Sequence, residues 1–291
     1  MRLCLYLLIF LPSSFALASP EPKWNGPWKT VSELETVLSA VPKGQEILSS
    51  AEKRDPDFRT KIRKGTSSFT ESTFQRSYSL LDGSEQVEQK FRISLNEKLN
   101  LAQATLDYAH ELVHFSLKEM QDPYQSNFQL KSFVQNGIEG KGGELAALEQ
   151  ECLIAWELEQ RFRNFPVHSL CVAYRSSAGD FLRDKAKKDY YALGHYYYSV
   201  PDHLKETFPQ VSFNAVRFSS SYAKKPYPVA LYEEFYQSKR SACENNRKKW
   251  ELISAQSQRG RNPASENLTG LKKKLIEFQK RNCLELPRDK Q

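Results

Sequence analysis

Apolar residues recur at helical spacing in two long stretches of the chain. Over residues 101–121 they fall on two faces of a helix, which predicts a helix that is buried on both sides. Residues 144–162 show the same spacing and predict a second long helix. Residues 31–48 predict short helical pieces broken at Pro42, and the four glycines within residues 137–143 predict a loop.

Two other stretches alternate between apolar and polar residues, as half-buried strands do. The first covers residues 72–81 and the second covers residues 86–96. Asp82 and Gly83 stand between them and form a turn signal, so the two stretches together predict a β-hairpin.

The C-terminal part of the chain is helical in pattern. Residues 229–256 and 266–282 predict two helices around a turn at residues 260–265, whereas residues 164–228 are rich in Tyr, Ser and Pro and have no clear period. We therefore expect an α+β, mainly helical protein with a small antiparallel sheet beside two core helices. Residues 19–228 would form one domain, and the helical hairpin of residues 229–291 would pack on it.

Residues 1–18 have the pattern of a secretory signal peptide. Arg2 precedes an apolar run over residues 3–11, and Ala16-Leu17-Ala18 forms an A-x-A cleavage site. Because the apolar run is too short for a transmembrane helix, we expect cleavage after Ala18 and no stable membrane insertion afterwards. The pattern predicts a periplasmic or secreted protein.

Export changes the interpretation of the cysteines. The chain after residue 18 contains Cys152, Cys171, Cys243 and Cys283, and an even number in an oxidising compartment predicts two disulfides. Three pairings are possible, and the simplest joins sequence neighbours, Cys152 to Cys171 and Cys243 to Cys283. A zinc site made of cysteines is a poor alternative, because no C-x-x-C spacing occurs.

Composition and charge narrow the class of protein. Hydrophobic residues make up 40% of the chain and charged residues 26%, which is typical of a soluble globular protein. Lys and Arg number 42 against 35 Asp and Glu, a formal charge of +7. We interpret this excess as modest and spread along the chain. The positive charge favours binding to anionic surfaces such as a cell envelope. Binding to nucleic acid is not expected, because it usually requires a dense basic stripe.

The first predicted long helix contains the motif H-E-x-x-H, formed by His110, Glu111 and His114. Positions i and i+4 share a face of a helix, so both imidazoles can bind one Zn²⁺ ion. Glu111 lies next to that face and can take the proton of a water molecule that attacks a carbonyl group. The motif therefore predicts a zinc hydrolase.

A site with two histidines needs a third protein ligand. Glu144 at the start of the second long helix is our first candidate, because Gly143 and Ala147 would let the two helices approach closely. Glu151, seven positions further on, falls on nearly the same helix face and is the alternative ligand, or a residue that orients a histidine. Glu149 falls on another face and is expected to be solvated.

His110-Glu111-x-x-His114 followed by a helical Glu144 resembles the zincin metallopeptidases, in the branch whose third ligand is Glu. The resemblance covers about a quarter of the chain. It implies a zinc peptidase in which an edge strand before the active-site helix binds extended substrate by main-chain pairing. Residues 91–96 hold the corresponding place in this sequence.

A zincin peptidase also uses a downstream Tyr or His to stabilise the oxyanion. The aromatic stretch from His195 through Tyr196 to Tyr198 supplies the candidates, with His195 and Tyr196 first. Our hypothesis is an exported zinc metallopeptidase that cleaves a peptide or protein substrate, including cell-envelope peptide. The alternative is a secreted zinc-binding or structural envelope protein without turnover.

Overall fold

The computed structural model describes residues 21–79, 84–258 and 266–283, and it shows an α+β, mainly helical protein. The expected fold class is therefore confirmed at this level. In chain order the elements are α1 (Val31–Leu38), α2 (Pro42–Arg54), η1 (Phe58–Lys61), β1 (Ile62–Gly65), β2 (Phe69–Tyr78), β3 (Glu85–Asn96), α3 (Leu101–Leu117), α4 (Leu130–Glu139), α5 (Glu144–Arg161), α6 (Ser169–Ala173), α7 (Arg183–Tyr190), η2 (Gly194–Tyr198), α8 (Asp202–Thr207), α9 (Tyr227–Gln258) and α10 (Glu266–Asn282).

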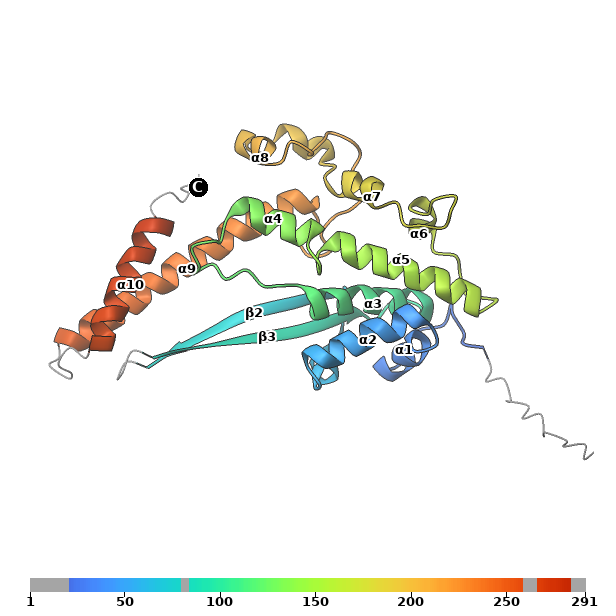
Figure 1. The fold of residues 1–291 in the computed structure, drawn as a ribbon, viewed down its shortest axis with the longest axis horizontal. Helices are drawn as coiled ribbons and strands as arrows, with labels where there is room; N and C mark the ends of the chain where they lie inside the picture. The colour runs from blue at the N-terminus through green and yellow to red at the C-terminus, as the bar shows by residue number, and fades with distance from the viewer. Residues whose placement is uncertain (1–20, 80–83, 259–265, 284–291) are drawn as a thin grey trace, which may run out of the picture.

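Helix α3 lies at the centre of the molecule (Figure 1). It packs against α1 and α2 on one side and against α5 on the other. Its aromatic residues Tyr108 and Phe115 are fully buried, as are Leu112 and Ala109 on the adjoining faces. The prediction of a helix buried on both sides is confirmed, because apolar side chains on two faces of α3 pack against neighbouring helices.

The sheet has three strands in the order β1-β3-β2. Strands β2 and β3 pair antiparallel, so the predicted hairpin is confirmed, although its turn at Asp82 and Gly83 lies outside the described residues. Strand β1 pairs with β3 in parallel. The sheet is thus mixed, and the expectation of an antiparallel sheet is wrong. The sequence does not predict β1, because its four residues do not alternate between buried and exposed positions.

The position of β3 also corrects the predicted substrate strand. Residues 91–96 are expected at an edge of the sheet. Instead, residues 93–96 pair with β1, and residues 85–94 pair with β2 on the other side of β3. The second strand of a hairpin becomes central when an earlier segment pairs with its free side, as β1 does here. Among the described residues, β2 borders the sheet on the side away from β1.

Glycines shape the region between α3 and α5. Gly137 belongs to α4, so the predicted loop is shorter and begins at Gly140. Its missing side chain lets α4 approach α9, since a Cβ atom there would lie 2.8 Å from Leu231 Cδ1. Helix α3 ends at Leu117, four residues before the predicted end, and Gly142 packs against that end. A Cβ atom on Gly142 would lie 2.1 Å from the backbone nitrogen of Lys118, so another residue would force the backbones apart.

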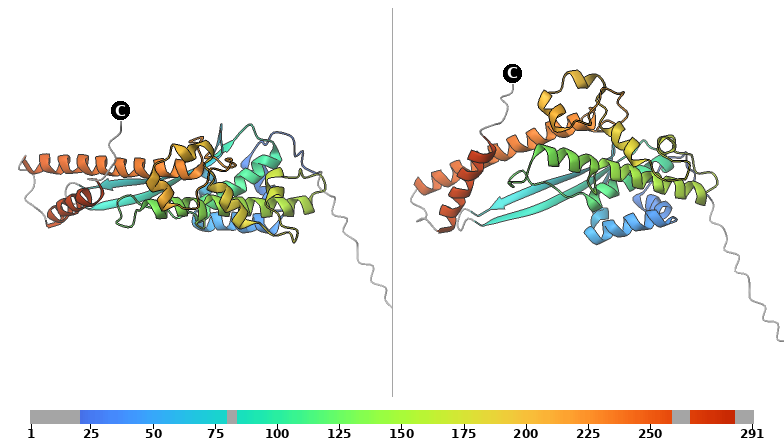
Figure 2. Two further views of the ribbon diagram at one scale, coloured as in Figure 1. Left: turned by 90° about the horizontal axis from the view of Figure 1, so that it is seen from above. Right: turned by 45° about the horizontal axis from the view of Figure 1, so that its top comes forward.

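Two disulfides join sequence neighbours, as the simplest pairing predicted. Cys152 on α5 bonds to Cys171 on α6, and Cys243 on α9 bonds to Cys283 after α10. Helices α9 and α10 form the predicted C-terminal hairpin, which runs out to one end of the molecule together with the tip of β2 and β3 (Figures 1 and 2). Glu85 at that tip forms ion pairs with Arg76 at 3.2 Å and with Lys249 of α9 at 3.4 Å.

Within the described part of the chain, no helix combines the length and apolar character needed to cross a membrane. The predicted signal peptide, residues 1–18, lies outside the described residues.

Replacing Gly44 with Ala is expected to destabilise the protein, although Ala is the better helix former. A Cβ atom at Gly44 in α2 would lie 2.0 Å from the carbonyl oxygen of Leu38. We expect Gly44→Ala to lower the free energy of unfolding by about 1–3 kcal/mol, because the backbone must move. Urea unfolding measures this.

Gly270 in α10 is the matched control, because a Cβ atom there would meet nothing within 4 Å. We expect Gly270→Ala to raise the free energy of unfolding of the α9–α10 hairpin by about 0.5–1 kcal/mol. A Gly44→Ala variant as stable as the Gly270→Ala variant would contradict the close packing of α2 on α1.

Candidate metal centre

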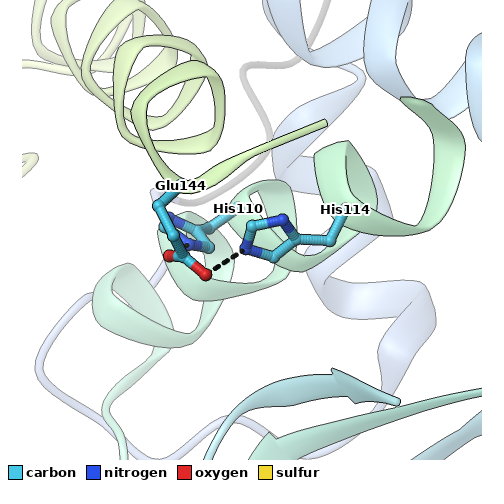
Figure 3. A group of neighbouring side chains, drawn as sticks. All are labelled: His110, His114 and Glu144. Carbon is cyan, nitrogen blue, oxygen red and sulfur yellow. Dashed lines mark ion pairs between the residues drawn. The ribbon is translucent and has the colours of Figure 1, made fainter. Parts of the chain in front are cut away.

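Helix α3 directs two imidazoles towards the beginning of α5 (Figure 3). His110 and His114 are one turn apart, and their ring centroids lie 4.9 Å from each other. Glu144, the first residue of α5, projects between the two rings. The three side chains are only 18%, 8% and 14% exposed, so the place where they meet is largely shielded from water.

The three side chains converge on one point. His110 Nε2 lies 3.5 Å from Glu144 Oε2, and His114 Nε2 lies 3.5 Å from Glu144 Oε1. All three ligand atoms lie within 4.8 Å of one another, and this group can hold a metal ion. Glu144 Oε2 is buried without a hydrogen-bond partner, which fits a carboxylate oxygen that binds a cation instead.

The other nitrogen of each imidazole is held by a hydrogen-bond acceptor. His114 Nδ1 donates to the carbonyl oxygen of Gly142 at 2.8 Å, and His110 Nδ1 lies 2.9 Å from Glu151 Oε2. Because a carbonyl oxygen can only accept, Nδ1 of His114 carries the proton and Nε2 presents its lone pair to the centre. Partners of this kind fix both the tautomer and the ring orientation of metal-binding histidines.

Of the two roles predicted for Glu151, metal ligand or residue that orients a histidine, its position matches the second. It lies behind His110 rather than at the meeting point, while Glu144 faces both rings. On its far side, Glu151 Oε1 lies 3.8 Å from His168 Nε2. The disulfide between Cys152 and Cys171 holds α6, and with it His168, against α5.

Charge attraction within the group overcomes the effect of burial. Burial disfavours the protonated form of His110, but Glu144 and Glu151 outweigh it and hold the pKa of His110 well above its ordinary value. Burial likewise disfavours the ionised form of Glu144, but His114 and His110 hold the pKa of Glu144 well below its ordinary value. The carboxylates of Glu144 and Glu151 thus favour a proton on His110, and a metal cation can take the place of that proton.

Glu111 lies beside this group and is 6% exposed. The hydroxyl of Thr70 on β2 donates a hydrogen bond to Glu111 Oε2 at 2.8 Å and fixes the carboxylate. Burial raises the pKa of Glu111, which the nearby imidazoles partly offset. A carboxylate with a raised pKa is a stronger base and suits proton transfer near neutral pH.

Tyr227, at the beginning of α9, is a neighbour of the group that the sequence analysis missed. Burial and the negative charge of Glu144 hold the pKa of Tyr227 well above its ordinary value, with a smaller contribution from Glu111. The ring of Tyr190 packs edge-on against Tyr227, and its hydroxyl donates to the carbonyl oxygen of Glu144 at 3.1 Å. No local motif marks Tyr227, because only the path of the chain over residues 191–226 brings it here.

His195 and Tyr196 lie on η2, where their rings contact each other in a tilted arrangement with centroids 4.3 Å apart. Among the described residues, none of the hydrogen bonds, ion pairs or ring contacts joins them to His110, His114 or Glu144. Their role as oxyanion-stabilising residues stays a prediction.

Comparisons with protein-family models, curated proteins and solved structures found no match to this chain. The case for a metal centre rests on the residues themselves.

Substitutions of three glutamates on α5 distinguish a ligand from its neighbours. We expect Glu144→Gln to weaken Zn²⁺ binding more than about a hundredfold, and Glu151→Gln to weaken it about ten- to a hundredfold through His110. Glu149, which forms an ion pair with Arg183 at the surface, is the control, and Glu149→Gln should bind like the wild type. Competition with a chromophoric chelator measures the affinities. Wild-type affinity in Glu144→Gln would contradict the proposed ligand set.

Proposed function

We propose that this protein is an exported, zinc-dependent peptidase in which His110, His114 and Glu144 bind Zn²⁺ and Glu111 is the general base. The observation that carries the proposal is the convergence of two imidazole nitrogens on one carboxylate, with a second, fixed carboxylate beside them. Ligand atoms about 2.0–2.1 Å from a tetrahedral zinc ion lie about 3.3–3.4 Å apart. Each imidazole nitrogen lies 3.5 Å from one of the two Glu144 oxygens, which is close to that value, and one ligand atom from each of the three residues lies within 4.8 Å of the others.

Glu111 would act on both proton transfers of peptide hydrolysis. Its carboxylate takes a proton from water as the water oxygen attacks the scissile carbonyl, and then gives this proton to the leaving amine when the C–N bond breaks. A bound Zn²⁺ ion supplies a Lewis acid that polarises the carbonyl and makes the water more acidic. Thr70 keeps the carboxylate in one orientation, so that no reorganisation is needed during the reaction.

Tyr227 would stabilise the oxyanion in place of His195 or Tyr196. A tyrosine phenol is protonated throughout the neutral range, and burial raises the pKa of Tyr227 further, so the hydroxyl can donate a hydrogen bond to developing negative charge. Its place beside Glu144 sets this donor at the edge of the metal centre.

Strand β2 is suited to binding an extended peptide. Its edge away from β3 pairs with no strand among the described residues. A cleft of about 1410 Å³ lies against β2, and its lining includes Ser72, Thr73 and Phe74 together with Gly142. The carbonyl oxygen of Gly142 accepts the hydrogen bond of His114, so Gly142 is the point at which this cleft comes next to the proposed metal centre, whose ligands do not themselves line the cleft. Main-chain pairing along an open edge gives affinity without requiring particular side chains.

The proposed substrate is therefore a peptide or protein in extended form, including cell-envelope peptide. Export to the periplasm or the extracellular space accords with the two disulfides, which persist in oxidising compartments.

A second candidate function is a secreted zinc-binding or structural envelope protein without turnover. The low exposure of His110, His114 and Glu144 favours it, because structural metal sites are closed to solvent. Full zinc occupancy with no cleavage of any peptide in a diverse library would select this function.

Glu111→Gln is expected to keep the metal and abolish hydrolysis. The amide preserves the size of the side chain and accepts from Thr70, but it cannot take a proton, so kcat should fall about 10²–10⁴-fold. Metal analysis and peptide cleavage by the same preparation check both parts. Full activity of this variant would show that Glu111 is not the base.

The oxyanion-stabilising residue is identified by comparing three single variants. We expect Tyr227→Phe to lower kcat about 10²–10³-fold with little change in KM, because only the transition state uses the hydroxyl. His195→Gln and Tyr196→Phe should each retain near wild-type kcat. A large loss in either of these two, with Tyr227→Phe unaffected, would restore the assignment made from the sequence.

A further inference from the structure

The net charge of the chain is concentrated in its C-terminal hairpin. Residues 239–282 contain twelve Lys and Arg against four Glu, a net charge of +8. The rest of the chain contains 30 basic and 31 acidic residues. The expectation of an evenly spread excess is therefore wrong. We call the part of α9 from Lys239 onward, together with α10, the C-terminal arm.

The C-terminal arm is a rigid extension of the body. The disulfide from Cys243 to Cys283 closes its base, and Ile253, Leu271 and Leu275 form a small core between the two helices. The arm projects from the body at one end of the molecule (Figure 2), where Lys249 is tied to Glu85 of β3. A surface on this arm needs no folding step before it binds a partner.

One side of the arm combines cations with exposed apolar side chains. Asn246 on α9 donates to Gln279 Oε1 and to the carbonyl oxygen of Leu275 on α10. Trp250 follows Asn246 by one turn, and Ile276 precedes Gln279 by about one turn, so both lie next to the seam between the helices, and neither is among the residues that line the cleft. We call this side the outer face; it comprises Trp250, Lys272, Lys273, Ile276 and Lys280.

The outer face is turned away from the cleft. Lys248, Lys274 and Arg281 of the arm line the cleft, whereas no residue of the outer face does. Trp250 is 37% exposed and Ile276 is 41% exposed. The five residues of the outer face include no acid. Glu277, the neighbour of Lys273 and Lys280 along α10, lines the cleft. Glu244 and Glu251 of α9 are in ion pairs with Lys248 and Arg247.

We infer that the outer face docks the protein on an anionic phospholipid bilayer. Lysines attract the headgroup phosphates, and their long side chains can reach the interface while aliphatic groups enter it. Trp side chains are enriched at the membrane–water interface. Ile276, which lies between Lys273 and Lys280 along α10, can insert at the boundary between the headgroups and the acyl chains. A nucleic acid or another soluble polyanion would satisfy the cations but leave Ile276 and Trp250 in water.

Vesicle binding by the full chain tests this inference independently of the metal centre, because the two sites share no residue. We expect binding to mixed phosphatidylcholine and phosphatidylglycerol vesicles, loss of binding to pure phosphatidylcholine, and weakening by salt. Lys273→Gln/Lys280→Gln should bind about thirtyfold more weakly. Lys53→Gln/Lys98→Gln removes the same charge from exposed positions on the body and should bind like the wild type.

Fluorescence distinguishes a bilayer from a soluble polyanion. The other three tryptophans, Trp24, Trp28 and Trp156, are at most 5% exposed, so brominated phosphatidylglycerol should quench Trp250 and spare the rest. Trp250→Phe should still bind vesicles but lose the quenching. Absence of quenching in the wild type, equal loss in the two double-lysine variants, or binding to heparin with none to vesicles would each overturn the proposal.

Discussion

The close approach of Gly142 to the end of α3 is the contact on which the proposed metal centre depends. Its carbonyl oxygen orients His114, and two residues later the chain begins α5 with Glu144. A side chain on Gly142 would collide with the backbone of Lys118 and move both groups. Since a ligand must be placed within a few tenths of an ångström to bind a metal ion, this backbone contact controls the geometry of the centre.

The helices that surround the centre give it a low-dielectric environment. Glu144 is the first residue of α5, where the helix dipole favours a carboxylate, and α3 supplies both imidazoles from one face. Within such an environment, charges interact more strongly than in water, so an ion and a fixed carboxylate can act on a bound carbonyl with greater effect. The cleft beside β2 comes next to this centre at Gly142, the residue whose carbonyl oxygen holds His114.

Local patterns in the sequence predicted the features that local physics determines. The helical period of α3 and α5, the spacing of His110 and His114 and the disulfides between neighbouring cysteines are of this kind. Glu144 was predictable because it begins a helix and follows Gly143.

Features set by distant segments could not be predicted in this way. Strand β1 has four residues without a pattern, yet it covers the free edge of β3, so that β3 is central and β2 lies at an edge of the sheet in the described part of the chain. Tyr227 comes next to Glu144 only through the path of the chain between η2 and α9, which includes α8, whereas the aromatic stretch at His195 is conspicuous in the sequence by its composition alone. The basic excess over residues 239–282 can be counted from the sequence, whereas the outer face of the C-terminal arm is defined only by the pairing of α9 with α10.

X-ray absorption spectroscopy of the purified full chain at the zinc edge tests the central claim most directly. The account predicts one zinc ion per chain, with imidazole scattering from two histidines and nitrogen and oxygen ligands at about 2.0–2.2 Å. A protein that purifies without zinc and fails to take it up, or a spectrum without imidazole scattering, would contradict it.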